Sequence, residues 1–181
     1  LKVMPKKGYT NLFSNMIKDQ NINLLLNTSY ENIKKKIKPK LATIYTGPPD
    51  AFFNFKYGKL DWRSLEFKFK TSKQKKIQEC VQINFPNDKK YTRKVEIKHV
   101  TRQKSQYTTL SYEFPNSKGD PYYPINNHKN RSMFKKYKKL IKKAEKNHVF
   151  FEGRLATYRY LNMDEVIEKA LNLFSKLKEK Y

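Results

Sequence analysis

The sequence FEGRLATYRYLNM at residues 151–163 connects an apolar strand pattern at residues 149–151 to an amphipathic helix pattern at residues 164–178. Gly153 has no side chain, so the backbone can come close to a ligand there. Arg154 adds a planar guanidinium that is always charged. From these features alone, the segment is either an ordinary strand–loop–helix connection or one that faces a bound ligand.

The helix pattern after this stretch begins at a recognisable cap. Asn162 is a favoured N-cap residue, and Glu165 stands three positions later, where it can complete a capping box. The N-terminus of a helix collects unpaired N–H groups and the positive end of the helix dipole. This end of the helix therefore suits an anionic group of a ligand.

Length and composition limit the class of protein. The chain has 181 residues, which allows one hydrophobic core or slightly more. No run of about 18 apolar residues occurs, so we expect no membrane-spanning helix. The single cysteine, Cys80, cannot form an internal disulfide, which suits a reducing, cytoplasmic location. No pattern of metal ligands is visible, and because Leu1 is not an initiator methionine we expect a fragment.

The net charge of +24 raises nucleic-acid binding as one function class. Only six of the 40 basic residues are arginine, and the lysines are spread over the whole chain. Specific readers of phosphates and bases rely on arginine forks, whereas scattered lysines are more often a solvated surface. A basic binder of nucleic acid or of an anionic surface is therefore the least favoured reading.

The first third of the chain is expected to alternate short helices and strands. The apolar patterns predict a helix at Thr10–Lys18, a short buried strand at Asn21–Leu26, a strand at Leu41–Tyr45 and a short helix or turn at Ala51–Tyr57. Gly47 and Pro48 mark an abrupt end to the third of these elements.

The middle of the chain predicts an antiparallel sheet, followed by a helix. Four strand patterns separated by turns occur at Arg63–Thr71, Glu79–Phe85, Arg93–Thr101 and Tyr107–Phe114. In the first of them Leu65, Phe67 and Phe69 alternate with charged residues, so we expect one buried face. A basic amphipathic helix is expected at Asn130–Lys146.

Several runs resemble the UDP-galactopyranose mutases over nearly the whole chain. They are YTGPPDAFFNFKYGKLDWRSL at 45–65, YTRKVEIKH at 91–99, PYYP at 121–124 and FEGRLATYRYLNM at 151–163. Five residues depart from the family pattern: Lys7 and Glu152 stand for glycines, Asn162 for an aspartate, Trp62 for a tyrosine and Pro49 for an isoleucine.

The resemblance implies a mixed α/β (α+β) fold: part of a Rossmann-like FAD-binding domain with an inserted antiparallel sheet that forms the substrate domain. The expected boundaries are 1–58 for the first part of the FAD-binding domain, 59–120 for the sheet, and 121–181 for the return to the FAD-binding domain.

The resemblance also implies roles for particular residues. The catalytic residue would be Arg93, near the flavin and the substrate diphosphate. The residues implied to bind substrate are Arg63, Asn84, Tyr123 and Tyr160. The residues implied to bind FAD are Gly47, Glu113, Gly153, Arg154, Asn162 and Met163.

In this family the reaction converts UDP-galactopyranose to UDP-galactofuranose. The resemblance implies that N5 of a reduced flavin attacks the anomeric carbon and UDP leaves. The sugar then opens as an iminium and recloses as the five-membered ring, and UDP re-attacks. The protein would position the diphosphate and adjust the electronics of the flavin.

The matched pattern corresponds to about the C-terminal half of a typical mutase. The G-x-G-x-x-G fingerprint and the helical substrate domain are absent from this sequence. We therefore expect a fragment that does not bind flavin tightly without an N-terminal half. A homodimer is one candidate assembly of the whole protein. A catalytically inactive, mutase-like module that binds nucleotide sugars is the main alternative function.

Overall fold

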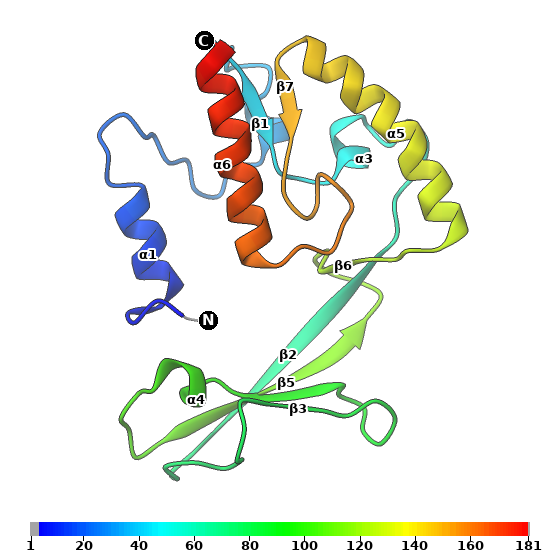
Figure 1. Cartoon of the computed structure of the whole chain (residues 1–181). Coiled ribbons are helices and arrows are strands. Elements are labelled where there is room, and N and C mark those ends of the chain that lie inside the picture. Colours follow the sequence, from blue (N-terminus) through cyan, green and yellow to red (C-terminus); the bar gives the residue numbers. More distant parts are fainter. Residues whose placement is uncertain (1–3, 181) are drawn as a thin grey trace. The chain divides into compact units, whose positions relative to one another are not determined.

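The computed structural model describes residues 4–180, which fold into two compact units (Figure 1). Unit 1 comprises the residues up to Asn27 together with Leu65–Asn116. Unit 2 comprises Thr28–Ser64 together with the residues from Ser117 onward. The elements in chain order are α1 (Gly8–Met16), α2 (Tyr30–Ile33), β1 (Thr43–Tyr45), α3 (Pro49–Phe52), β2 (Trp62–Ser72), β3 (Gln82–Asn84), β4 (Arg93–Glu96), α4 (Lys98–Thr101), β5 (Thr108–Asn116), β6 (Tyr123–Pro124), α5 (His128–Lys146), β7 (Val149–Phe151) and α6 (Met163–Lys180).

Unit 1 contains β3, β4, β5 and most of β2 from a five-stranded sheet with the order β3-β4-β5-β2-β6. The β3–β4 and β4–β5 pairs are antiparallel, so that Arg93 lies between Asn84 on one side and Glu113 on the other. The predicted antiparallel sheet is therefore confirmed.

A buried carboxylate joins two segments of unit 1. Glu96 is fully buried and accepts hydrogen bonds from Gln78 N at 2.8 Å, Ile77 N at 3.1 Å and Thr108 Oγ1 at 2.6 Å. Burial alone would raise the pKa of Glu96, but these three donors and the neighbouring His99 outweigh it, and the net effect is a lowered pKa. Glu96 is thus held as an anion at the end of β4.

Unit 2 contains a parallel pair, in which β1 aligns Tyr45 with Phe151 of β7. Its core is formed by Leu60, Phe134, Tyr137 and Tyr158. Helix α5 contributes two of these side chains because its apolar residues recur on one face. The side chain of Asn127 caps α5 by accepting from Asn130 N at 2.8 Å. The chain is thus a mixed α/β fold with an antiparallel and a parallel sheet, as predicted.

Three predictions about elements are wrong. Asn21–Leu26 forms no strand, and Leu24, Leu25 and Leu26 are exposed. An apolar run predicts burial, but a strand also has to join a sheet, and neither sheet in residues 4–180 includes this run. The pattern at Arg93–Thr101 ends as a strand at Glu96 and continues as helix α4, because the Glu96 network turns the chain there. On β2 the predicted burial of alternate residues fails, since Phe69 is 70% exposed.

The long helices were predicted well. Helix α5 begins two residues before the predicted start, and α6 begins one residue before it. No helix within residues 4–180 has the length and apolar character needed to cross a bilayer.

Candidate functional site

The loop between β7 and α6 is held in one conformation by its own hydrogen bonds. Gly153 has φ +94°, a conformation that side chains disfavour, and its carbonyl accepts from both the backbone N (3.1 Å) and Oγ1 (2.7 Å) of Thr157. The backbone N of Arg159 donates to the carbonyl of Arg154 at 3.2 Å. Residues 153–159 therefore form a compact turn.

Tyr158 anchors this loop to the core of unit 2. Its hydroxyl donates to the carbonyls of Asp61 at 2.6 Å and Ile125 at 3.2 Å, and its ring packs edge-on against Trp62. Burial raises the pKa of Tyr158 to about 12. Tyr158 also has φ +48°, which is uncommon for an aromatic residue and is maintained here by these contacts.

Arg154 connects three segments of unit 2. Its Nε and Nη2 donate to the carbonyl of Leu161 at 3.2 and 2.7 Å, and its Nη1 donates to the carbonyl of Tyr122 at 3.2 Å. The guanidinium carbon lies 4.5 Å from the ring centroid of Tyr160 and 5.8 Å from that of Tyr123. Both distances are within the range of cation–π contacts.

The two tyrosines predicted to bind substrate lie together. The rings of Tyr123 and Tyr160 stack with centroids 5.7 Å apart and planes 11° apart. Tyr123, on β6, is paired with Arg63 at the start of β2. The structure therefore brings four predicted residues together in unit 2: Arg63, Tyr123, Arg154 and Tyr160.

The tyrosine pair lines a groove of about 500 Å³ next to α5. Sequence reasoning missed three cations that also line it: Arg131, Lys138 and Arg159. None of the lining residues, all within the described part of the chain, is acidic. Arg131 and Lys138 stand seven positions apart on α5, a spacing that places them on one helix face and could have signalled the groove.

The other predicted substrate and catalytic residues form a separate cluster in unit 1. Arg93 Nη1 lies 3.2 Å from Glu113 Oε2, and the Glu113 side chain is largely buried. Asn84 is the register partner of Arg93 and accepts a hydrogen bond from Gln82 Nε2 at 2.8 Å. Glu113 thus neutralises and orients the Arg93 guanidinium.

The family model described as UDP-galactopyranose mutase matches residues 1–160 of this chain. The chain belongs to the UDP-galactopyranose mutase family. It is 39% identical over 193 residues to the UDP-galactopyranose mutase of Mycoplasma genitalium, covering 95% of this chain and 47% of that protein. It is 35% identical over 173 residues to a probable UDP-galactopyranose mutase of Klebsiella pneumoniae, covering 93% and 44%. It is 33% identical over 180 residues to a dTDP-fucopyranose mutase of Escherichia coli, covering 93% and 46%. The chain spans a little under half the length of these curated relatives.

Of the two glycines that the family resemblance implies to bind FAD, Gly153 has open space beside its backbone. A side chain at Gly153 would meet only Thr46 Cβ, at 4.0 Å, so a planar ring could approach the backbone there. Gly47 differs, because a side chain at that position would lie 2.6 Å from the Tyr45 hydroxyl. The lack of a side chain at Gly47 is therefore explained by its packing against Tyr45. The backbone at Gly153 is therefore open to a group placed beside it.

The start of α6 fits an anionic group less well than the sequence predicted. The backbone N–H of Asn162 donates to Glu165 Oε2 at 2.6 Å, which confirms one half of the capping box. Asp164 adds a second carboxylate to the first turn, and the neighbouring Met163 is half-exposed. These acids already compensate the positive end of the dipole, so the start of α6 suits a neutral ligand group better than an anionic one.

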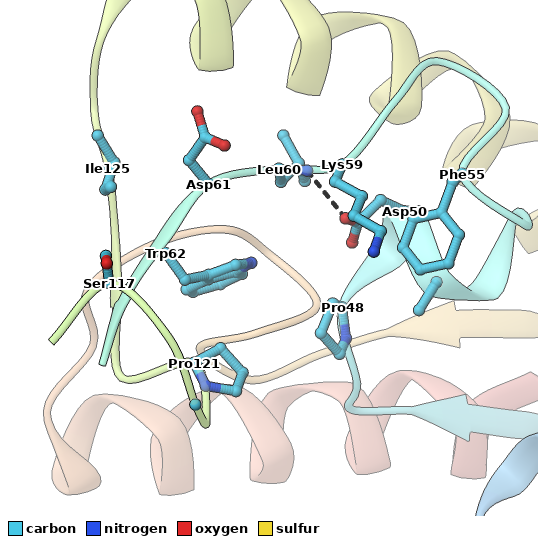
Figure 2. Close-up of a pocket in the computed structure, with 12 residues that line it drawn as sticks. Pro48, Asp50, Phe55, Lys59, Leu60, Asp61, Trp62, Ser117, Pro121 and Ile125 are labelled. Atoms are coloured by element: carbon cyan, nitrogen blue, oxygen red, sulfur yellow. Dashed lines mark hydrogen bonds between the residues drawn. The ribbon is translucent and has the colours of Figure 1, made fainter. Parts of the chain in front are cut away.

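A second cavity of about 670 Å³ lies in unit 2 (Figure 2). It is lined by both acidic and basic side chains, among them Asp50, Lys59 and Asp61, and by the ring of Trp62. Asp50 is buried and accepts from Leu60 N at 2.9 Å, so it closes the turn between α3 and β2. None of the residues predicted to bind substrate or cofactor lines this cavity, and the groove beside the tyrosine pair is the stronger candidate site.

Proposed function

We propose that this chain is part of a flavin-dependent isomerase that interconverts UDP-galactopyranose and UDP-galactofuranose. The observation that carries the proposal is the stacked pair Tyr123 and Tyr160, in contact with Arg154, at a groove whose lining includes cations and, among residues 4–180, no acids. A diphosphate offers several acceptor oxygens and negative charge. Phenol hydroxyls and cations are the groups that match it.

The residues of this chain would bind and stabilise the diphosphate. The hydroxyls of Tyr123 and Tyr160 would donate to phosphate oxygens without adding a full charge to the bound state. Arg93 would stabilise the negative charge that grows on the diphosphate as it leaves the sugar. Its partner Glu113 supports this role by holding the guanidinium in place. Arg63 and Asn84 are proposed as further substrate contacts on the strength of the family pattern.

The cofactor of the proposed reaction is FAD, which when bound and reduced supplies the nucleophile for the sugar. Gly153 would let the flavin approach the backbone, and Arg154, Asn162 and Met163 would surround its edge. The other contacts with FAD would have to come from polypeptide that corresponds to the part of the relatives outside the matched region. We also propose a cytoplasmic location, because a lone cysteine suits a reducing compartment.

We propose that unit 2 is part of a Rossmann-like FAD-binding domain. Its parallel β1–β7 pair with α5 against β7 supports this, because parallel strands occur mostly in α/β folds with helices on the sheet faces. The antiparallel sheet of unit 1 would then be the inserted substrate domain.

A second candidate substrate is a dTDP-linked sugar. It is favoured by the 33% identity to the dTDP-fucopyranose mutase of Escherichia coli. Both candidates share a diphosphate attached to a six-membered ring, so the same groove would serve either one.

The test uses the whole protein that carries this chain. Its visible spectrum is recorded, and the UDP- and dTDP-sugars are then incubated with and without dithionite and separated by chromatography. We expect a yellow protein that forms the furanose only when it is reduced, and loss of activity in Arg93→Lys but not in the exposed control Arg102→Lys. A colourless protein that binds UDP would point to the inactive module, and one that ignores both nucleotides would refute the proposed function.

A further inference from the structure

Most of the N–H groups of Arg154 donate hydrogen bonds to backbone carbonyls of the protein itself. Arginine has five N–H donors, and three of them here point to the carbonyls of Leu161 and Tyr122. Leu161 follows Tyr160 in the chain, and Tyr122 precedes Tyr123. Each hydrogen-bonded carbonyl is therefore one residue away from one of the two phenols, so Arg154 holds both backbones at once.

The same guanidinium also holds the rings. It lies 4.5 Å from the Tyr160 centroid and 5.8 Å from the Tyr123 centroid, and the two rings are nearly parallel. Tyr160 is 55% exposed, so little else restricts its rotation. A side chain this exposed keeps a fixed ring orientation only where a specific contact provides it.

Only arginine can form all of these contacts. Its planar fork reaches two carbonyls in different directions while its face stacks on an aromatic ring, whereas lysine offers a single point charge on a flexible stem. Substitution by lysine would therefore keep the charge near the groove but lose the geometry.

We propose that Arg154 is a positioning residue that sets the spacing and angle of the Tyr123 and Tyr160 hydroxyls and acts on the substrate diphosphate through them. This rests on the proposed function. This positioning role differs from contact with a cofactor, because a positioning Arg154 affects the affinity for substrate even when no cofactor is bound. The two N–H groups that remain would still be free to face a flavin.

The experiment is a double-mutant cycle on UDP affinity, measured by calorimetry with the flavin-free whole protein. Arg154→Lys should weaken UDP binding about tenfold or more, the size of a lost charge-assisted hydrogen bond. In a protein that already carries Tyr123→Phe and Tyr160→Phe, the same change should weaken binding less than about twofold, because no hydroxyl is left to position. Arg102→Lys, an exposed arginine outside both clusters, is the control for lost arginine character.

The outcomes separate this inference from the proposed function. If the wild-type protein binds UDP and Arg154→Lys binds it equally well, the positioning role is wrong and the proposed function stands. If Arg154→Lys weakens binding equally in both backgrounds, Arg154 contacts UDP directly and the inference is again refuted. A wild-type protein that does not bind UDP refutes the proposed function and the substrate role of Arg154 together. Should Arg154→Lys fail to fold, Arg154→Gln replaces it in the same cycle.

Discussion

Tyr137→Phe should destabilise unit 2 strongly, although it removes one oxygen atom and keeps the ring. Tyr137 is fully buried, and its hydroxyl donates to the carbonyl of Gly58 at 2.8 Å and accepts from the backbone N of Tyr57 at 3.0 Å. Burial raises the pKa of Tyr137, as expected for a hydroxyl shielded from water.

The magnitude follows from the groups left behind. The substitution leaves the partly buried N–H of Tyr57 and the partly buried C=O of Gly58 without this partner. A lost hydrogen bond costs about 1 kcal/mol net, and an unsatisfied buried group about 1–3 kcal/mol. Because two hydrogen bonds are lost and both backbone groups are only partly shielded from water, the free energy of unfolding should fall by about 1–3 kcal/mol.

Urea unfolding measures the effect, followed by the fluorescence of Trp62. This is the single tryptophan and it packs against the core of unit 2, so its signal reports on that unit. Tyr57→Phe is the matched control, because Tyr57 contacts the Tyr137 ring and its own hydroxyl makes no hydrogen bond within the described residues. The control should change the stability by less than about 0.5 kcal/mol. A loss below about 1 kcal/mol in Tyr137→Phe would refute the reasoning, since it would mean that water or another group satisfies both backbone atoms.

Two further predictions concern pH. Glu96 has a lowered pKa in the folded chain, so its contribution to stability is present above the unfolded pKa of about 4.3 and lost as the pH falls through the folded value. Glu96→Gln should therefore lower the stability of unit 1 at neutral pH and reduce the loss of stability as the pH falls. Urea midpoints measured by circular dichroism at several pH values test this, and the same dependence of the midpoint on pH as in the wild type would contradict it. Tyr158 has its pKa raised to about 12, so its contribution is complete below the unfolded pKa of about 10 and is lost as the pH rises toward the folded value. An alkaline titration followed by the ultraviolet absorbance of tyrosinate should show one fewer tyrosine that ionises late in Tyr158→Phe than in the wild type. An identical titration curve would argue against the raised pKa.

Local patterns predicted most of the elements because their signals lie within a few residues. The periodicity of α5 and α6 and the Asn162–Glu165 spacing each depend on neighbours in sequence, and each matches the structure closely. The strand patterns were less reliable. The run at Asn21–Leu26 is apolar, but whether an apolar run pairs as a strand depends on a distant partner.

The sequence by itself determined the family, the mixed α/β class and which tyrosines and arginines to compare, because runs that resemble a family and short-range periodicity are written directly in the order of residues. The tertiary structure alone decided how those residues are used. It placed Tyr123 against Tyr160 across 37 positions of sequence, turned the Arg154 fork onto two backbone carbonyls, and aligned Arg131 and Lys138 with the same groove. The physical reason is that contacts between distant segments depend on how the whole unit packs, and packing is not visible in any local pattern.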